Sequence, residues 1–245
     1  MSPQEGIPLF YMQELANISS KLKFDDRFGG DSVSWHWNIW LGEIETGSLI
    51  VVQDGKLEIS IAETNNGNWK SGHNEAPRIY INMLSQPCII KTKMTYFSNP
   101  LGDGFAGLFI GKQSIGDPDV DYFFFGRGVD DQGSAGEDSI RVSQQCGAIQ
   151  AQVVGLTTLP IWLRIRLSCF DEKAVLAYYD YSLDNLNWTN LFEHKGDPAV
   201  TLGRQDGGQT VGLVCGNGTY LSGTYHGCHA KFDRFTIISS APNQP

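Results

Sequence analysis

The chain has 245 residues, with 18 basic and 27 acidic side chains that give a formal net charge of −9 at pH 7. This balance argues against nucleic acid as a partner, because phosphate binding requires a basic surface. A charged fraction of 18% beside 11% aromatic residues excludes an intrinsically disordered chain. No run of about 18 apolar residues occurs, so we expect no membrane span.

The first residues are predicted to lie outside the folded domain. We divide the sequence into an N-terminal extension of residues 1–23, one β-sandwich domain of residues 24–240 and a tail of residues 241–245. The opening segment has neither a basic start nor a long apolar run, so it lacks the pattern of a signal peptide. We expect a cytoplasmic protein as the sequence is written, or an extracellular one if a leader was removed.

From residue 24 onward, apolar residues alternate with polar or small ones, which is typical of strands with one buried face. Turn formers, among them 28 glycines and 10 prolines, separate these segments. The sequence therefore predicts an all-β fold, a two-sheet antiparallel sandwich of the jelly-roll type in a single domain. The predicted inward positions are Leu57, Ile59, Ile61, Ile90, Thr92, Met94, Ala106, Leu108, Ile110, Ile161, Leu163, Ile165, Leu167, Cys169, Val211, Leu213, Cys215, Phe232, Phe235 and Ile237.

The five cysteines are an odd number, so they cannot all form disulfides within the chain. Cys215 lies in an apolar strand pattern, where a free thiol behaves as a small hydrophobic side chain. A disulfide between Cys215 and Cys228 is the alternative if their strands are neighbours. The cysteines are Cys88, Cys146, Cys169, Cys215 and Cys228.

Aromatic residues in polar stretches are candidate platforms for sugars, because the CH face of a sugar ring stacks on an aromatic ring. Trp69 lies in a polar, glycine-rich stretch, and with His73 and Asn74 it forms the first candidate. Tyr220 and Tyr225, in a loop of glycine, serine and threonine, form the second. The alternative for such residues is packing in the core or at a sheet edge.

Two arginines, Arg164 and Arg166, are predicted to project from the same face of one strand, next to Tyr179 and Tyr181 of the following strand. A planar guanidinium group beside aromatic rings can bind hydroxyls or a carboxylate. The alternative is a surface lattice of ion pairs with Asp180, which contributes little to stability.

Acidic residues suggest a structural Ca²⁺ as a cofactor. Asp25 and Asp26 belong to the first predicted strand and Asp233 to the last, and their oxygens would converge if these strands run side by side. A long acidic loop, residues 114–137, offers further carboxylates, although a solvated acidic loop is the alternative.

Several segments follow one another along the chain in a recognisable order: LKFDDRFGGDSVSWHWNIW, DGKLEISI, GFAGLFIG, WLRIRL, AYYDYSLDNLNWTNL, TVGLVCGN and AKFDRFTI. Together they resemble the concanavalin A-like lectin/glucanase superfamily. The resemblance is strongest to the C-terminal accessory domain of family 43 β-xylosidases and to related small uncharacterised sandwich proteins, and covers roughly residues 24–238. It implies a concanavalin A-like sandwich with a carbohydrate-related role.

Three functions are compatible with this fold. The first is a non-catalytic, lectin-like domain that holds a glycan or polysaccharide by aromatic stacking and polar side chains. The second is a glycoside hydrolase or polysaccharide lyase, and the third is a protein-interaction domain with a protein partner. Glucanases of this fold carry a Glu-x-Asp-x-x-Glu run, whereas the nearest run here, Glu43-Ile44-Glu45, lacks the third acid. The sequence thus favours a binding function over catalysis.

Overall fold

The computed structural model describes residues 22–42, 47–62, 69–70, 73–74, 76–83, 88–98, 104–112, 122–130, 137–144, 148–171, 174–196, 209–217 and 227–239. Within these ranges the regular elements are strands: β1 (Leu22–Asp26), β2 (Asn38–Trp40), β3 (Ser48–Gln53), β4 (Lys56–Ile61), β5 (Trp69–Lys70), β6 (His73–Asn74), β7 (Arg78–Met83), β8 (Cys88–Ser98), β9 (Gly104–Lys112), β10 (Tyr122–Asp130), β11 (Glu137–Gln144), β12 (Ala148–Val154), β13 (Ile161–Asp171), β14 (Ala174–Ser182), β15 (Thr189–Gly196), β16 (Gln209–Asn217) and β17 (Cys228–Ser239). No helix in these ranges has the length and hydrophobicity needed to cross a membrane.

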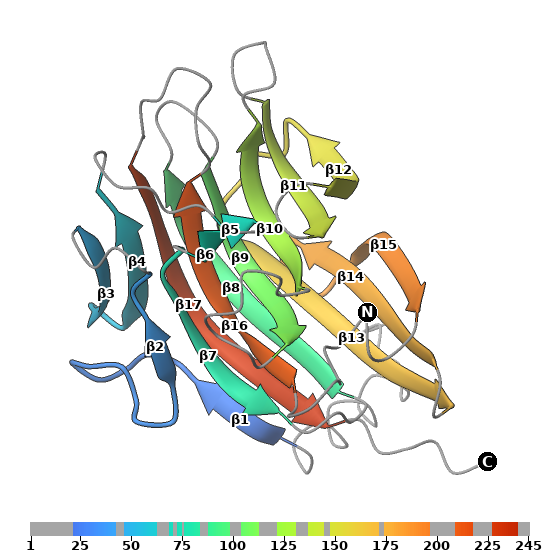
Figure 1. Cartoon of the computed structure of the whole chain (residues 1–245), viewed down its shortest axis with the longest axis horizontal. Helices are drawn as coiled ribbons and strands as arrows, with labels where there is room; N and C mark the ends of the chain where they lie inside the picture. Colours follow the sequence, from blue (N-terminus) through green and yellow to red (C-terminus); the bar gives the residue numbers. More distant parts are fainter. Residues whose placement is uncertain are drawn as a thin grey trace, which may run out of the picture.

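The strands form two large antiparallel sheets, which confirms the predicted sandwich. Within the described ranges the first sheet has eight strands, in the order β15-β14-β13-β8-β17-β4-β3 with β1 paired to β17. The second has seven, in the order β12-β11-β10-β9-β16-β7-β2. In Figure 1 the strands of the two sheets overlap, with β2 and β3 at the left and β12 and β15 at the right. The short strands β5 and β6 pair separately.

The core lies between the two sheets and includes the predicted inward positions other than Cys169, whose side chain lies outside the described part of the chain. Ile59, Ile90 and Ile165 of the first sheet and Leu108 and Leu213 of the second are fully buried. Each such side chain contributes about 1.5–3 kcal/mol on leaving water. Because side chains alternate along a strand, the residues between these positions are directed to the outer faces of the sandwich.

Candidate functional site

Outward side chains of the first sheet form one continuous polar surface, which we call the polar face. On β13, Leu163 and Ile165 are buried in the core, while Trp162, Arg164 and Arg166 between and beside them are half-buried on the outer side. Neighbouring strands add residues in register with these. The polar face consists of Glu58, Ser60, Lys91, Lys93, Tyr96, Trp162, Arg164, Arg166, Tyr178, Asp180, His229, Lys231 and Arg234.

Asp180 orients both predicted arginines. Its Oδ2 accepts hydrogen bonds from Arg164 Nε at 2.9 Å and Arg166 Nε at 2.6 Å. Its Oδ1 accepts from Arg166 NH2 at 3.1 Å and from Asn190 Nδ2 at 2.9 Å. Burial of Asp180, which is 1% exposed, favours a higher pKa, but these hydrogen bonds and the arginine charges outweigh it and lower the pKa. The predicted alternative, an ion-pair lattice around Asp180, is therefore present.

Aromatic rings lie directly against this lattice. The Arg164 guanidinium is 4.0 Å from the ring centre of Trp188, and that of Arg166 is 4.4 Å from the ring centre of Tyr178. Both distances are within the range of cation–π attraction. The arginines are thus held between a carboxylate and a ring, and their planes have fixed orientations.

The expected neighbour Tyr179 is not on this face, which corrects the prediction. Asp180 is the cross-strand partner of Arg164, so it shares the outer face with that residue, and Tyr179 points the opposite way. Tyr179 is fully buried in the core, and its hydroxyl has no hydrogen-bond partner within the described ranges. The ring beside the arginines is Tyr178 instead.

Two lysines flank a tryptophan in the middle of the polar face. Lys91 Nζ and Lys93 Nζ lie 5.2 Å and 5.7 Å from the ring centre of Trp162. Lys93 forms an ion pair with Asp233, whereas Lys91 donates a hydrogen bond to the amide oxygen of Asn185 at 3.1 Å. The two lysines thus differ in their partners, a carboxylate for one and an amide for the other.

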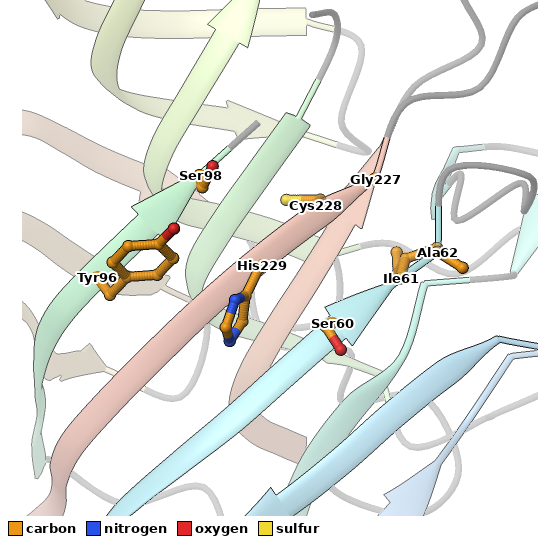
Figure 2. Close-up of a pocket in the computed structure, with 8 residues that line it drawn as sticks. All are labelled: Ser60, Ile61, Ala62, Tyr96, Ser98, Gly227, Cys228 and His229. Atoms are coloured by element: carbon orange, nitrogen blue, oxygen red, sulfur yellow. The ribbon is translucent and has the colours of Figure 1, made fainter. Parts of the chain in front are cut away.

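A shallow hollow of about 280 Å³ lies at one end of the polar face. Figure 2 shows His229 of β17 between Tyr96 of β8 and Ser60 of β4. The rings of Tyr96 and His229 have centres 5.1 Å apart, and Tyr96 is 41% exposed. Residues that line the hollow are Ser60, Ile61, Ala62, Tyr96, Ser98, Gly227, Cys228 and His229.

A carboxylate lies next to this hollow. Glu58 forms an ion pair with Lys231, and its Oε2 is 3.2 Å from His229 Nε2. Burial of Glu58 favours a higher pKa, but the hydrogen bond and charge of Lys231 and the contact with His229 outweigh it, so the pKa falls below its ordinary value. The hollow therefore combines an exposed ring, hydroxyls and an ionised carboxylate beside it.

Five predicted sugar contacts are residues whose side chains, or all of whose atoms, lie outside the described part of the structure. Trp69 and Asn74 are cross-strand partners in the β5–β6 pair, which also includes His73, and their backbones alone are described. Tyr220 and Tyr225 lie outside the described residues. These assignments remain predictions.

The three predicted calcium ligands each have another partner. β1 does run beside β17, as expected. Asp25 accepts two hydrogen bonds from Arg234 at 2.8 Å, Asp26 accepts one from Trp37 Nε1 at 2.7 Å, and Asp233 is paired with a lysine of β8. In the part of the chain that is described, no three His, Cys, Asp or Glu side chains gather as a metal site. The calcium assignment remains a prediction.

The outer face of the second sheet is a further feature that the sequence did not reveal. Phe105, Phe109 and Phe124 form a separate buried cluster there. Beside it, Arg141 and Ser143 are 7% and 1% exposed, and neither Arg141 Nε nor Ser143 Oγ has a hydrogen-bond partner among the described residues. The available signal was GFAGLFIG, in which Phe105 and Phe109 alternate with apolar residues, so that large side chains occupy both faces of one strand.

Comparison with known proteins gives a likeness in structure alone. No protein-family model and no curated protein sequence matches the chain. The GH43 protein BlXynB from Bacillus licheniformis superimposes with a TM-score of 0.65 at 17% identity, over 89% of this chain and 39% of that one. Xylan β-1,4-xylosidase from Bacillus halodurans gives 0.57 at 16% identity, over 98% and 40%. The chain has the concanavalin A-like sandwich fold.

This chain spans about two fifths of the length of those two bacterial proteins. Winged bean acidic lectin, solved with methyl-α-D-galactose, superimposes with a TM-score of 0.53 at 11% identity, over 89% of this chain and 98% of the lectin. The concanavalin A-like sandwich is thus shared by glycosidases and lectins, and function must be argued from the side chains of this chain.

Proposed function

We propose that this chain binds a carbohydrate on the polar face and does not cleave it. The observation that carries the proposal is the interleaving, on one partly exposed sheet face, of aromatic rings with guanidinium, amide and carboxylate groups of fixed orientation. Sugars offer CH faces for stacking and hydroxyls for hydrogen bonds, so such a surface matches both. The lectin and glycosidases that share the fold support a saccharide as the ligand.

The hollow is the part of the polar face suited to a sugar ring. Tyr96 offers an exposed ring for stacking, and the hydroxyls of Ser60 and Ser98 offer hydrogen bonds on either side of His229. Ionised Glu58 accepts hydrogen bonds from sugar hydroxyls, which are stronger than those to neutral acceptors. Trp162 is the cross-strand partner of Lys93 on β8, three residues from Tyr96, so we expect it to contact a further sugar unit of the same polysaccharide.

The protonation states of two acids of the polar face, Glu58 and Asp180, favour binding over hydrolysis at this face. A glycosidase needs one carboxylic acid that stays protonated near neutral pH, with a raised pKa. Glu58 and Asp180 have lowered pKa values instead, and they are ionised at neutral pH. Such groups accept hydrogen bonds from hydroxyls and do not donate a proton to a leaving group.

The test is a polysaccharide panel, with retention measured by affinity electrophoresis and product release measured by reducing-sugar assay. We expect retention without release. Tyr96→Ala and Trp162→Ala should each weaken retention at least tenfold, because each removes a stacking surface. Trp35→Ala is the matched control, since Trp35 is 85% exposed and lies outside the polar face. A wild-type chain that binds no saccharide, or releases sugars, would overturn the proposal.

Trp69→Ala belongs in the same panel, because Trp69 is the tryptophan that the sequence favoured. Loss of retention in Trp69→Ala with full retention in Tyr96→Ala and Trp162→Ala would move the site from the polar face to the β5–β6 pair. Full retention in all three variants would show that the saccharide site lies neither on the polar face nor at the β5–β6 pair.

A further inference from the structure

Lys91 differs from the other cations of the polar face in its partner. Arg164 and Arg166 share Asp180, Lys93 has Asp233, Lys231 has Glu58 and Arg234 has Asp25. Among the described residues, Lys91 instead has the neutral amide of Asn185 as its hydrogen-bond partner. The charge on Lys91 is therefore not matched by a carboxylate of its own.

The position of Lys91 concentrates positive potential at this point. On β8 it lies opposite Arg164 of β13 and opposite Thr236 of β17, two residues along the strand from the Lys93–Arg234 pair. Among the described residues, the nearby Asp184 carboxylate forms no ion pair with Lys91 and instead accepts hydrogen bonds from the backbone of Leu186 and Asn187 at 2.8 Å.

The ionisation of Lys91 reflects these surroundings. Burial, followed by the charges of Arg234 and Arg164, lowers its pKa to about 8, against a smaller opposing effect of Asp25. Charged groups face it from β13, β17 and β1, Lys93 lies on its own strand, and the turn after β14 contributes the Asn185 amide. An anion bound at Nζ would satisfy the ammonium group and relieve the repulsion among these cations.

We infer that Lys91, Asn185 and Trp162 form a subsite for the anionic group of an acidic saccharide. The carboxylate of a uronic acid or a sulfate ester would pair with Lys91 Nζ, and its sugar ring would lie beside the Trp162 indole. This inference rests on the proposed carbohydrate-binding function and names the class of saccharide. The ion pairs of the polar face agree with this inference. Asp180, Asp233, Glu58 and Asp25 are paired with other cations of the face, whereas the described partner of Lys91 is an amide.

The experiment measures dissociation constants for four polysaccharides: polygalacturonate, a sulfated galactan, neutral xylan and neutral laminarin. We expect the wild-type chain to bind an acidic polysaccharide at least tenfold more tightly than the neutral ones. The ratio of the dissociation constants for polygalacturonate and the sulfated galactan shows whether the subsite prefers a carboxylate or a sulfate. Lys91→Met should remove that preference, because the affinity for acidic polysaccharide should fall at least tenfold more than the affinity for neutral polysaccharide. Lys56→Met, the same change in charge at the start of β4, should keep it.

Two further readouts separate a binding role from a structural one. Lys91→Met should melt no lower than the wild-type chain, because it removes a partly desolvated cation from beside two arginines. Preference of the wild-type chain for acidic polysaccharide should fall as the pH rises from 6.5 to 9.5, since Lys91 loses its proton while the arginines keep theirs.

The failures of the two proposals are distinguishable. Equal binding of acidic and neutral polysaccharides by the wild-type chain, or an unchanged preference in Lys91→Met, would overturn this inference and leave carbohydrate binding standing. Absence of binding to all four polysaccharides would overturn both.

Discussion

Cys215 and Cys228 face each other across the interior, with their sulfur atoms 3.2 Å apart. Cys215 belongs to β16 of the second sheet and Cys228 to β17 of the first, so a bond between them would join the two layers. Both thiols are buried and free. The neighbouring strands that a disulfide would require are therefore present, although they lie in opposite sheets.

We predict that a diazene oxidant such as diamide converts this pair to a disulfide, the two thiol hydrogens passing to the oxidant. Burial and the adjacent Cys228 raise the pKa of Cys215, so the reaction should be slow at neutral pH. With the partners 13 positions apart, closure should stabilise the fold by about 3 kcal/mol. Peptide mapping without a reducing agent should detect a peptide in which Cys215 and Cys228 are linked. The Cys228→Ser variant should not yield this peptide. A link through Cys88 instead would contradict the prediction.

Asp180 is expected to contribute more to stability than the other acids of the polar face. In Asp180→Asn the two arginines lose their shared carboxylate, and because they are partly exposed we expect a loss of about 2 kcal/mol in the free energy of unfolding. Asp233→Asn is the control, since Asp233 is 36% exposed and its loss should cost less than about 1 kcal/mol. Urea denaturation measures both, and equal effects would contradict the prediction.

The carboxylates of Asp180 and Glu58 should make the stability of the fold depend on pH in the acid range. Asp180 and Glu58 have pKa values below their ordinary 3.8 and 4.5, so their stabilising effect is complete above about pH 5 and is lost as the pH falls through the lowered values. The loss of stability between pH 5 and pH 2 should be smaller in Asp180→Asn than in the wild-type chain. An identical slope in the two proteins would mean that Asp180 is not responsible.

Tyr179→Phe should stabilise the protein. The Tyr179 hydroxyl is fully buried and has no hydrogen-bond partner in the part of the chain that the structure describes, and such a group costs about 1–3 kcal/mol relative to a satisfied one. Phenylalanine keeps the ring contacts with Phe123 and Phe125. We expect a higher melting temperature, measured by calorimetry, with Tyr181→Phe as the half-buried control. A lower melting temperature in Tyr179→Phe would show that the hydroxyl does have a partner.

Gly212→Ala should be strongly destabilising. A Cβ atom at Gly212 would lie 1.9 Å from the carbonyl oxygen of Ile79 on β7, so the backbone of one strand would have to move. Gly29→Ala is the matched control, because a Cβ atom there meets nothing within 4 Å. We expect a loss of at least about 2 kcal/mol for the first substitution and less than about 1 kcal/mol for the second. Urea denaturation measures both losses in the free energy of unfolding. Equal losses in the two variants would contradict the prediction.

The calcium hypothesis predicts that Ca²⁺ raises the melting temperature and that EDTA reverses the rise. The positions of Asp25, Asp26 and Asp233 lead us to expect no such change from these residues, since each already has an ion pair or hydrogen bond. The measurement is a thermal scan with about 5 mM Ca²⁺ and with EDTA, a concentration about 50 times a Kd of about 0.1 mM. A rise in the wild-type chain that disappears in Asp26→Asn would restore the calcium site.

Much of the architecture was predictable because the signal is local. Alternation with a period of two placed Leu57, Ile90 and Ile165 in the core and Arg164 with Arg166 on one outer face, and burial confirms each placement. The same rule failed at β14, where Tyr178 and Tyr179 are identical in type and adjacent, so the pattern alone does not tell which ring faces outward.

Which residues are neighbours across strands could be known only from the tertiary structure. Lys91, Arg164 and Arg234 come from three strands distant in sequence, and their contact follows from the order β13-β8-β17 in the first sheet. The pairing of Arg164 with Asp180 likewise depends on register. Period-two patterning records the face of each strand but carries no information about which strand lies beside it, because strand order is set by how the entire core packs.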